Sequence, residues 1–253
     1  MKPIRMLRSL VRCFGYDLQK TSDPFQDQRR LLSGVAVRTV FDVGANVGAV
    51  TRALHECFPE SMIHSFEPFP ESFESLCAKF RGEPWFKPVR AAVSDRSGRQ
   101  TLYVNRKSTS NSLLPVATGA EDWVSPRKIA NVTTARVEVT TIDEYCRQEA
   151  IDEIHVLKMD IQGGEMTALR GAAEMLSRKA VSLIYTEALF VPLYQGQPSF
   201  HELCAFLTDH GYALFNLYDL HHARGMRQVL WGNALFVNEP IRHSAIDSAR
   251  NGP

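Results

Sequence analysis

The stretch Thr39-Val-Phe-Asp-Val-Gly-Ala-Asn-Val-Gly-Ala-Val50 decides the fold class of this chain. Its apolar run from Val40 to Val43 predicts a short buried strand, and the glycines that follow predict a turn into a helix over residues 47–58. A strand that turns on glycine into a helix leaves free backbone N–H groups at a positively polarised helix end. The stretch therefore predicts a turn that binds a ligand.

Glu67 closes a second candidate strand, residues 62–67, and this position narrows the class of ligand. A glycine turn after one strand and an acid at the end of the next is the layout of folds that hold an adenosine ribose by its hydroxyls. A dinucleotide site needs Gly-x-Gly-x-x-Gly, whereas here Asn46 stands where the middle glycine would approach a pyrophosphate. The spacing from Gly44 to Gly48 therefore favours S-adenosylmethionine, which has no pyrophosphate. The alternative is that these glycines serve only tight packing.

Composition bounds the class of protein. The 253 residues are enough for one large α/β domain, and 44% hydrophobic residues are enough for a sizeable core. A net charge of +1 gives no electrostatic reason to expect nucleic acid as a partner. Five scattered cysteines without a Cys-x-x-Cys pair indicate reduced thiols and a cytoplasmic protein. We expect neither a secretory signal nor a transmembrane segment, because arginines interrupt the apolar N-terminus and no apolar run approaches about eighteen residues.

Three parts are expected along the chain: an N-terminal helical lead-in over residues 1–36, a main domain over residues 37–240, and a loose polar tail over residues 241–253. Within the lead-in, apolar residues over 4–14 recur at helical spacing, with arginines largely on the other face. We favour a helix that packs on the edge of the core. A helix that lies on a membrane surface is the alternative.

Strand and helix patterns alternate through the main domain. Beyond the first two strands, the residue pattern predicts strands at 85–92, 100–104, 135–140, 153–160 and 181–187 and a closing pair at 212–218 and 229–237. It predicts helices at 71–80, 142–148, 165–176 and 200–210. This alternation is typical of an α/β protein with a doubly wound, mostly parallel sheet. The long polar segment 105–131 indicates a lid, a binding loop or partial disorder.

Four acids end four of the predicted strands: Asp42, Glu67, Asp160 and Glu187. In doubly wound sheets, ligands bind beyond the carboxyl ends of the strands, near the point where the strand order reverses. Acidic side chains at the ends of buried strands need partners. We therefore expect the functional site at this edge.

Four blocks carry a resemblance to a known family: Phe41-Asp-Val-Gly-Ala-Asn-Val-Gly48, Phe66-Glu-Pro-Phe-Pro-Glu-Ser-Phe73, Ala91-Ala-Val-Ser-Asp95 and Leu157-Lys-Met-Asp-Ile-Gln-Gly-Gly-Glu-Met166. Together with Thr140-Thr-Ile-Asp-Glu144 they resemble the FkbM family of S-adenosylmethionine-dependent O-methyltransferases, in order over about residues 38–190. The resemblance implies a Rossmann-like class I methyltransferase fold. The family pattern Asp-x-Glu-Gly-x-Glu has Gln162 here in place of its middle acid.

The resemblance implies a cofactor site, residue by residue. Gly44, Ala45, Asn46 and Gly48 would bind the methionine end, Glu67 with Pro68 beside it would bind the ribose, and Ala92 and Ser94 would border the adenine. Asp42 would hold the amino group of the cofactor or, alternatively, fix the turn as a cap.

A hydroxyl acceptor is a poor nucleophile, so a base or a metal ion should assist methyl transfer. Asp160 is the first candidate base, Glu187 the second and Glu165 the third, although an acid at position 165 would also be favoured by the helix dipole alone. The alternative is a Mg²⁺ ion held by Asp160 and Glu187.

The acceptor should contact the variable segments. Tyr194, Gln195, Tyr218 and His221 suit a hydroxylated acceptor, because they combine flat or aliphatic faces with hydrogen-bonding groups.

The leading hypothesis is an O-methyltransferase that acts on a hydroxyl of a sugar, glycolipid or secondary metabolite, with a small-molecule or glycan acceptor as its partner. The alternatives are an inactive methyltransferase-like scaffold protein, which the Gln162 departure favours, and a nucleotide-dependent oxidoreductase, which the missing glycine disfavours. A homo-oligomer is left open.

Overall fold

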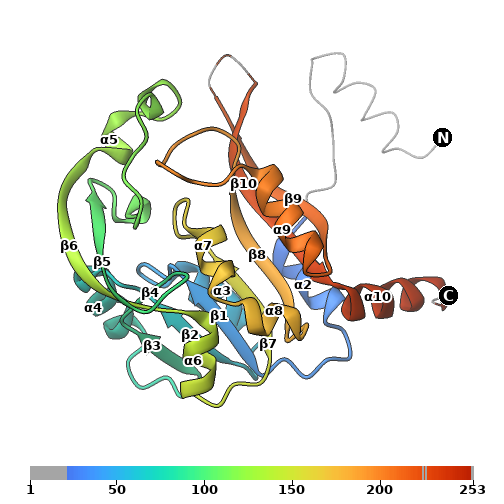
Figure 1. The fold of residues 1–253 in the computed structure, drawn as a ribbon. Helices are drawn as coiled ribbons and strands as arrows, with labels where there is room; N and C mark the ends of the chain where they lie inside the picture. The colour runs from blue at the N-terminus through green and yellow to red at the C-terminus, as the bar shows by residue number, and fades with distance from the viewer. Residues whose placement is uncertain (1–21, 224, 226, 252–253) are drawn as a thin grey trace, which may run out of the picture.

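The computed structural model describes residues 22–251 except 224 and 226 (Figure 1). The helix expected over residues 4–14 lies outside the described residues. The first described helix, α2 (Pro24–Leu31), begins at a proline, which suits the first helical position because it lacks an N–H. Asp23 caps it, since its Oδ1 accepts a hydrogen bond from the backbone N–H of Phe25 at 2.9 Å.

The central sheet has seven strands in the order β3-β2-β1-β7-β8-β10-β9. The parallel members are β1 (Thr39–Val43), β2 (Met62–Phe66), β3 (Phe86–Val89), β7 (Ile154–Met159) and β8 (Val181–Leu189). β10 (Val229–Asn238) lies antiparallel between β8 and β9 (Tyr212–His222). The doubly wound, mostly parallel sheet is confirmed, and its strand order reverses between β1 and β7.

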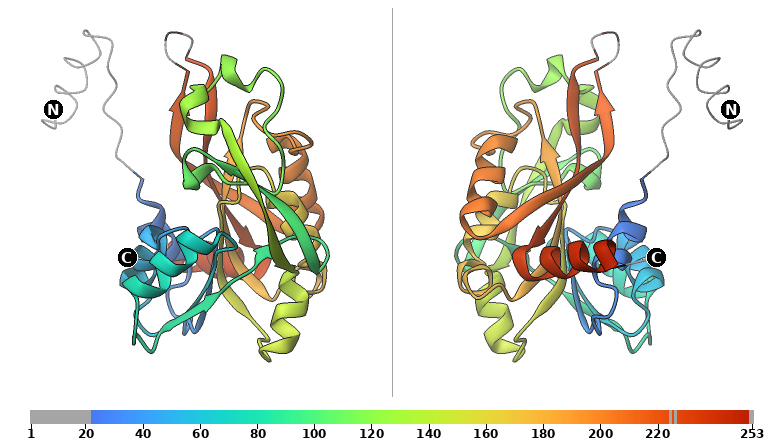
Figure 2. Two further views of the ribbon diagram at one scale, coloured as in Figure 1. Left: turned by 90° about the vertical axis from the view of Figure 1, so that its left-hand side faces the viewer. Right: turned by 90° about the vertical axis from the view of Figure 1, so that its right-hand side faces the viewer.

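Helices cover both faces of this sheet (Figure 2). One face carries α2, α3 (Ala49–Cys57), α4 (Pro70–Lys79) and α10 (Glu239–Asn251), and the other carries α6 (Ile142–Gln148), α7 (Glu165–Arg170), α8 (Ala173–Ser177) and α9 (Phe200–Asp209). Neighbouring strand residues divide between the two cores, because side chains alternate along a strand. Val40 packs with Leu31 and Leu54, whereas Phe41 packs with Leu169 in the other core.

A second, three-stranded sheet of order β4-β6-β5 stands beside the first. It consists of β4 (Ala92–Val93), β5 (Gly98–Asn105) and β6 (Asn131–Thr140). The polar segment between β5 and β6 contains the short helices η1 (Ser108–Ser110), η2 (Ala120–Asp122) and α5 (Pro126–Ile129). Bridges from Ser112 to Tyr103 and from Val116 to Tyr194 join this segment to β5 and to the loop after β8. Figure 1 shows the β5–β6 ribbon and the β9–β10 pair on opposite sides of α7.

Three expected elements differ from the structure. The strand expected over 85–92 is divided: residues 86–89 form β3 of the central sheet, whereas Ala92 belongs to β4, which pairs with β6 in the second sheet. The helix expected over 165–176 is broken into α7 and α8 around Gly171, where a Cβ atom would lie 2.1 Å from the carbonyl oxygen of Ser94. The tail expected to be loose forms α10, because Ile241 and Ala245 pack against the core on the α2 side. Asn238 caps this helix by accepting a hydrogen bond from the N–H of Ile241 at 3.0 Å. Within the part of the chain that the structure describes, no helix is both long and apolar enough to cross a membrane.

Candidate active site

A cavity of about 270 Å³ opens beyond the carboxyl ends of β1, β2 and β7, at the reversal of strand order. Of the residues expected at the site, Gly44, Ala45, Asn46, Glu67, Pro68, Ala92, Ser94 and Asp160 line this cavity. The structure does not bring Asp42, Gly48, Glu165, Glu187, Tyr194, Gln195, Tyr218 or His221 to its wall. Most of the expected cofactor residues are therefore gathered in one place, and the expected acceptor residues are not.

The glycine turn brings the first strand against the strand that carries Asp160. Gly44 has a φ of 79°, and a Cβ there would lie 2.0 Å from the carbonyl oxygen of Asp160. Only glycine allows this approach. Gly48 has a different function: a Cβ at that position would strike the rings and methyls of Phe80 and Leu76, so it lets α3 approach α4.

The free N–H groups lie further along the chain than the sequence suggests. The N–H groups of Gly44 and Ala45 both donate to the carbonyl of Phe66 at 3.0 Å, and that of Asn46 donates to Glu67. α3 begins at Gly48 without a side-chain cap, and Ala49 and Val50 of its first turn line the cavity. The positive end of α3 therefore faces the ligand space.

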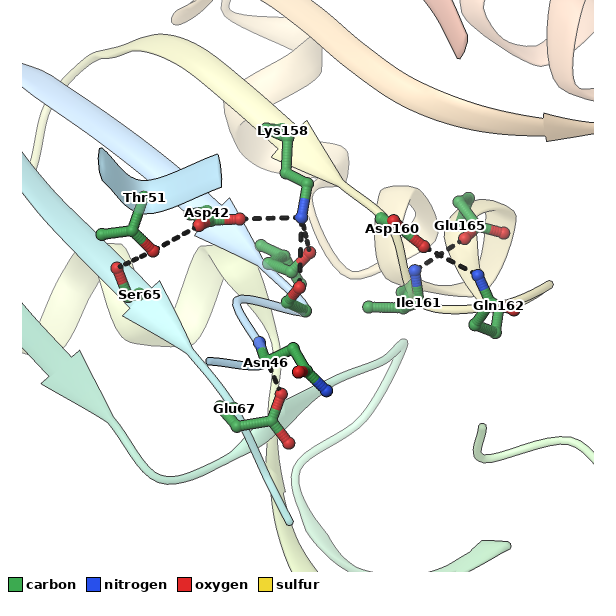
Figure 3. Close-up of polar contacts among 12 residues, drawn as sticks. Asp42, Asn46, Thr51, Ser65, Glu67, Lys158, Asp160, Ile161, Gln162 and Glu165 are labelled. Atoms are coloured by element: carbon green, nitrogen blue, oxygen red, sulfur yellow. Dashed lines mark hydrogen bonds and ion pairs between the residues drawn. The ribbon is translucent and has the colours of Figure 1, made fainter. Parts of the chain in front are cut away.

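Glu67 is held by two backbone donors. Its Oε2 accepts from Asn46 N at 2.9 Å (Figure 3). Its Oε1 accepts from Phe69 N at 2.8 Å, and the side chain is buried at the cavity wall. Burial raises the pKa of Glu67 to about 7, against the lowering effect of these two hydrogen bonds. Each carboxylate oxygen keeps a lone pair for a further donor, as binding of a pair of ribose hydroxyls requires.

Asp42 lies behind the cavity wall, where it is fully buried. Its Oδ1 lies 2.8 Å from Nζ of Lys158, its partner across the β1–β7 ladder, and its Oδ2 accepts from the hydroxyl of Thr51 at 2.6 Å. Lys158 also donates to the carbonyl of Gly44 at 3.1 Å. This geometry favours the alternative in which Asp42 fixes the turn.

Lys158 is a site residue that the sequence reasoning did not single out. It lines the cavity and is buried within β7. Burial alone would lower the pKa of Lys158, but the carboxylate of Asp42, with those of Asp160 and Glu187, leaves that pKa above its ordinary value. The signal was present, because a lysine inside an apolar strand needs a buried counter-charge.

Asp160, Gln162 and Glu165 lie together at the turn after β7 (Figure 3). The amide nitrogen of Gln162 donates to Oδ1 of Asp160 and to Oε2 of Glu187, both at 2.8 Å. Oε1 of Glu165 accepts from the N–H of Ile161 at 2.9 Å. Asp160 and Gln162 face the main cavity. Glu165 and Glu187 line a separate pocket of about 10 Å³, which has room for no more than about one water molecule.

Burial raises the pKa of Glu165 to about 7. It also raises the pKa of Glu187, and the nearby charge of Asp160 adds to that rise. Because only Asp160 of the three candidate bases lines the main cavity, it is the one that an acceptor there can reach.

The four residues expected to bind the acceptor are dispersed. Tyr194 is buried, and its hydroxyl donates to Oε1 of Gln162 at 2.7 Å. Gln195 is exposed and donates to the carbonyl of Val116. Tyr218 lies in the core on the α2 side and donates to Asp27, and His221 stacks on Trp231 at the exposed end of β9.

Polar side chains of the 105–131 segment line the cavity instead. They are Ser108, Thr109, Asn111 and Ser112. The amide of Asn46 donates to the hydroxyl of Ser108 at 3.2 Å, so this segment touches the glycine turn directly. The sequence indicated a binding segment here, but its polarity did not single out these residues.

The described residues contain no group of three or more His, Cys, Asp or Glu side chains arranged to hold a metal ion. Asp160 and Glu187, the pair considered for Mg²⁺, are joined by a donor amide instead. A cation would need oxygen ligands at the position where this NH₂ group lies.

The strand order, the glycine turn against the end of β7 and the acid that follows β2 are those of a Rossmann-like fold with a site for an adenosine ribose. Comparison with known proteins gives the family. The sequence model of the methyltransferase FkbM domain matches residues 42–214, and the chain therefore belongs to the FkbM methyltransferase family.

Individual relatives are distant. The 2-O-methyltransferase NoeI of Sinorhizobium fredii (strain NBRC 101917 / NGR234) is 24% identical over 201 residues, which is 76% of this chain and 80% of that protein. The 31-O-demethyl-FK506 methyltransferase FkbM of Streptomyces tacrolimicus is 29% identical over 173 residues, which is 59% of this chain and 66% of that protein. Among solved structures, Aeropyrum pernix fibrillarin in complex with natively bound S-adenosyl-L-methionine superposes with a TM-score of 0.41 at 14% identity, covering 83% of this chain and 74% of that one.

Proposed function

We propose that this methyltransferase transfers the methyl group to oxygen, on a hydroxyl of a sugar, glycolipid or secondary metabolite. The observation that carries this proposal is that Asp160 lines the same cavity as Gly44 and Glu67. A carboxylate within reach of the cofactor space can accept the proton of a hydroxyl. The names of both relatives, which state O-methyl transfer or an O-demethyl substrate, support oxygen as the acceptor atom.

The cofactor residues divide the work by chemistry. Glu67 accepts hydrogen bonds from the ribose hydroxyls, Ala92 and Ser94 border the adenine, and the turn 44–46 with the start of α3 receives the methionine end. Lys158 and Asp42 hold the turn from behind. S-adenosylmethionine, when bound, supplies a methyl group activated by a sulfonium.

The reaction needs one base and in-line placement. The acceptor oxygen forms a bond to the methyl carbon while the carbon–sulfur bond breaks, its proton passes to Asp160, and S-adenosylhomocysteine leaves. Holding two reactants in line can lower a barrier by roughly 7–11 kcal/mol. The polar side chains of Ser108, Thr109 and Asn111 line the same cavity, where they can orient the acceptor.

The first test is calorimetric titration of the purified protein with S-adenosylhomocysteine, repeated for Glu67→Ala. We expect micromolar binding by the wild type and a loss of about tenfold or more in the variant, because a charged acceptor of two hydrogen bonds is worth roughly 1.5–3 kcal/mol. No binding by the wild type would contradict the cofactor assignment.

The second test is a screen of hydroxyl acceptors with wild type and Asp160→Asn. The substituted side chain keeps the shape and one acceptor oxygen of the aspartate but cannot take a proton, so turnover should fall by roughly 10²–10⁴-fold while S-adenosylhomocysteine still binds. Full turnover by Asp160→Asn would remove Asp160 as the base. Binding of the cofactor without turnover of any hydroxyl acceptor by the wild type would favour the scaffold alternative.

A further inference from the structure

Gln162 occupies the centre of a polar network that links four segments of the chain. Its amide nitrogen donates to Asp160 and Glu187, and its amide oxygen accepts from the hydroxyl of Tyr194. Its backbone carbonyl accepts from the hydroxyl of Ser112 at 2.7 Å. Both hydrogens and the oxygen of the amide are thus used, which fixes the direction in which it points.

The backbone at Gln162 is also held in an unusual conformation. Its φ is 56°, in the left-handed region that glutamine rarely adopts, and Gly163 follows with a φ of 92°. Such a residue costs on the order of 1–3 kcal/mol and persists where the surrounding contacts determine it. In this conformation the amide of Gln162 lies between the two carboxylates.

A pair of carboxylates brought together at a buried edge repel each other unless something positive or hydrogen-bonding lies between them. A divalent cation is one solution and a donor amide is another. Lys158, paired with Asp42, already supplies a positive charge behind the site. The amide therefore stabilises the pair of Asp160 and Glu187 by hydrogen bonding, without adding a charge.

We propose that Gln162 is a positioning residue that holds Asp160 and Glu187 together with its neutral amide, in place of a divalent cation, so that the reaction needs no metal ion. The inference rests on the proposed function for the part that Asp160 plays as base. Tyr194, which was expected to contact the acceptor, acts instead behind Gln162 and fixes the amide.

Metal binding tests the inference without an acceptor. Wild type, Gln162→Glu and Gln148→Glu are titrated with MgCl₂ and with MnCl₂ by calorimetry. Gln148 is the matched control, since its amide also donates to a carboxylate, that of Glu144, but on the exposed surface of α6. We expect saturable binding only by Gln162→Glu, because three clustered carboxylates form a set of oxygen ligands for these ions.

Kinetics separate positioning from a merely structural part. With any acceptor that the wild type turns over, EDTA should leave the rate unchanged. Gln162→Glu should lower kcat by about 100-fold, as expected for a displaced reacting group, with S-adenosylhomocysteine affinity unchanged, and Mg²⁺ should restore part of kcat. Tyr194→Phe, which removes only the hydroxyl that fixes the amide, should lower kcat by a smaller factor without any response to Mg²⁺.

Three results would overturn the inference: saturable Mg²⁺ binding by the wild type that Glu187→Gln abolishes, inhibition of the wild type by EDTA, or wild-type kcat in Gln162→Glu. If Gln162→Glu does not fold, as circular dichroism would show, the wild-type titration and Tyr194→Phe decide. If no acceptor is turned over, the proposed function fails, and the metal titrations still decide on Gln162.

Discussion

The ionisation of Glu67 should make cofactor affinity depend on pH. Both of its oxygens already accept backbone N–H groups, and burial raises its pKa to about 7. A pair of ribose hydroxyls donates to an ionised carboxylate better than to a carboxylic acid. S-adenosylhomocysteine affinity should therefore increase as pH rises from 6 to 8 and level off above the pKa, as calorimetric titration at half-unit steps would show.

Glu67→Gln is the matched variant for this prediction, because it keeps the size and one acceptor but does not titrate. Its affinity should be lower than that of the wild type above pH 7, and the dependence on pH should disappear. A variant that keeps the same pH dependence would show that another group is responsible.

The pair of Asp42 and Lys158 makes a prediction about stability. Both side chains are buried and lie 2.8 Å apart. Lys158→Met leaves the carboxylate of Asp42 buried without its counter-charge, which should cost roughly 3–5 kcal/mol of the free energy of unfolding. The double variant Asp42→Asn/Lys158→Met should cost less than Lys158→Met alone, because no charge is then left unpaired. Urea unfolding of the wild type, Asp42→Asn, Lys158→Met and the double variant measures the coupling. If the two single losses added up to the loss of the double variant, the coupling would be contradicted.

At the scale of elements, the close approach of α7 and α8 to β4 links packing with the site. A Cβ at Gly171 would lie 2.1 Å from the carbonyl oxygen of Ser94, which lines the cavity. Gly171→Ala should therefore displace the strand end that borders the adenine, costing roughly 1–3 kcal/mol of stability and weakening S-adenosylhomocysteine binding.

Gly82→Ala is the control for Gly171→Ala. Gly82 has a φ of 82°, and a Cβ there meets nothing within 4 Å, so this variant carries only a backbone cost of about 1 kcal/mol. It should leave cofactor affinity unchanged. Equal affinities for Gly171→Ala and Gly82→Ala would show that the contact with Ser94 does not position the site.

The elements that could be predicted from sequence are those whose signal is local. The pattern over 39–50 predicted β1, the turn and α3, since apolar residues and glycines act on their immediate neighbours. The break at Gly171 could not be predicted, because its cause is a carbonyl that belongs to a distant strand. The helix α10 could not be predicted for the same reason. Among its described side chains, only two apolar ones, Ile241 and Ala245, pack against the core on the α2 side, and their partners come from distant parts of the chain.

The candidate site divides along the same line. Strand ends are set by local pattern, and parallel strands deliver them to one edge, so Glu67 and Asp160 were predicted together and lie on one cavity. Tyr218 was predicted from the chemistry of its side chain alone. Alternation along β9 places this side chain on the face of the sheet that packs against α2, where it donates to Asp27. Which face a closing strand presents depends on its register with β10, and the bulges in that pairing are not visible in sequence.

For the whole molecule, the doubly wound sheet gathers buried carboxyl groups at one edge. Glu67 and Glu165 both have a pKa raised to about 7 by burial, and that of Glu187 is raised as well. Groups of this kind stabilise the folded state fully below their unfolded pKa, near 4.5, and lose that contribution as pH rises through the folded pKa. The site is therefore assembled at a cost in stability that grows toward neutral pH.

Glu165→Gln tests this cost, since glutamine resembles the protonated acid and can still accept from the N–H of Ile161. A rise of the Glu165 pKa from 4.5 to about 7 corresponds to roughly 3 kcal/mol at most, so the variant should gain on the wild type by up to that amount between pH 4.5 and 8. Buried His64, whose pKa is lowered to about 4, changes stability in the opposite direction below pH 6.5, but equally in both proteins, so it cancels in the difference. Urea unfolding at half-unit steps of pH gives the two curves. The control is Glu138→Gln, on the exposed face of β6, whose curve of unfolding free energy against pH should be parallel to that of the wild type. A parallel curve for Glu165→Gln would mean that the buried acid at the start of α7 does not oppose folding.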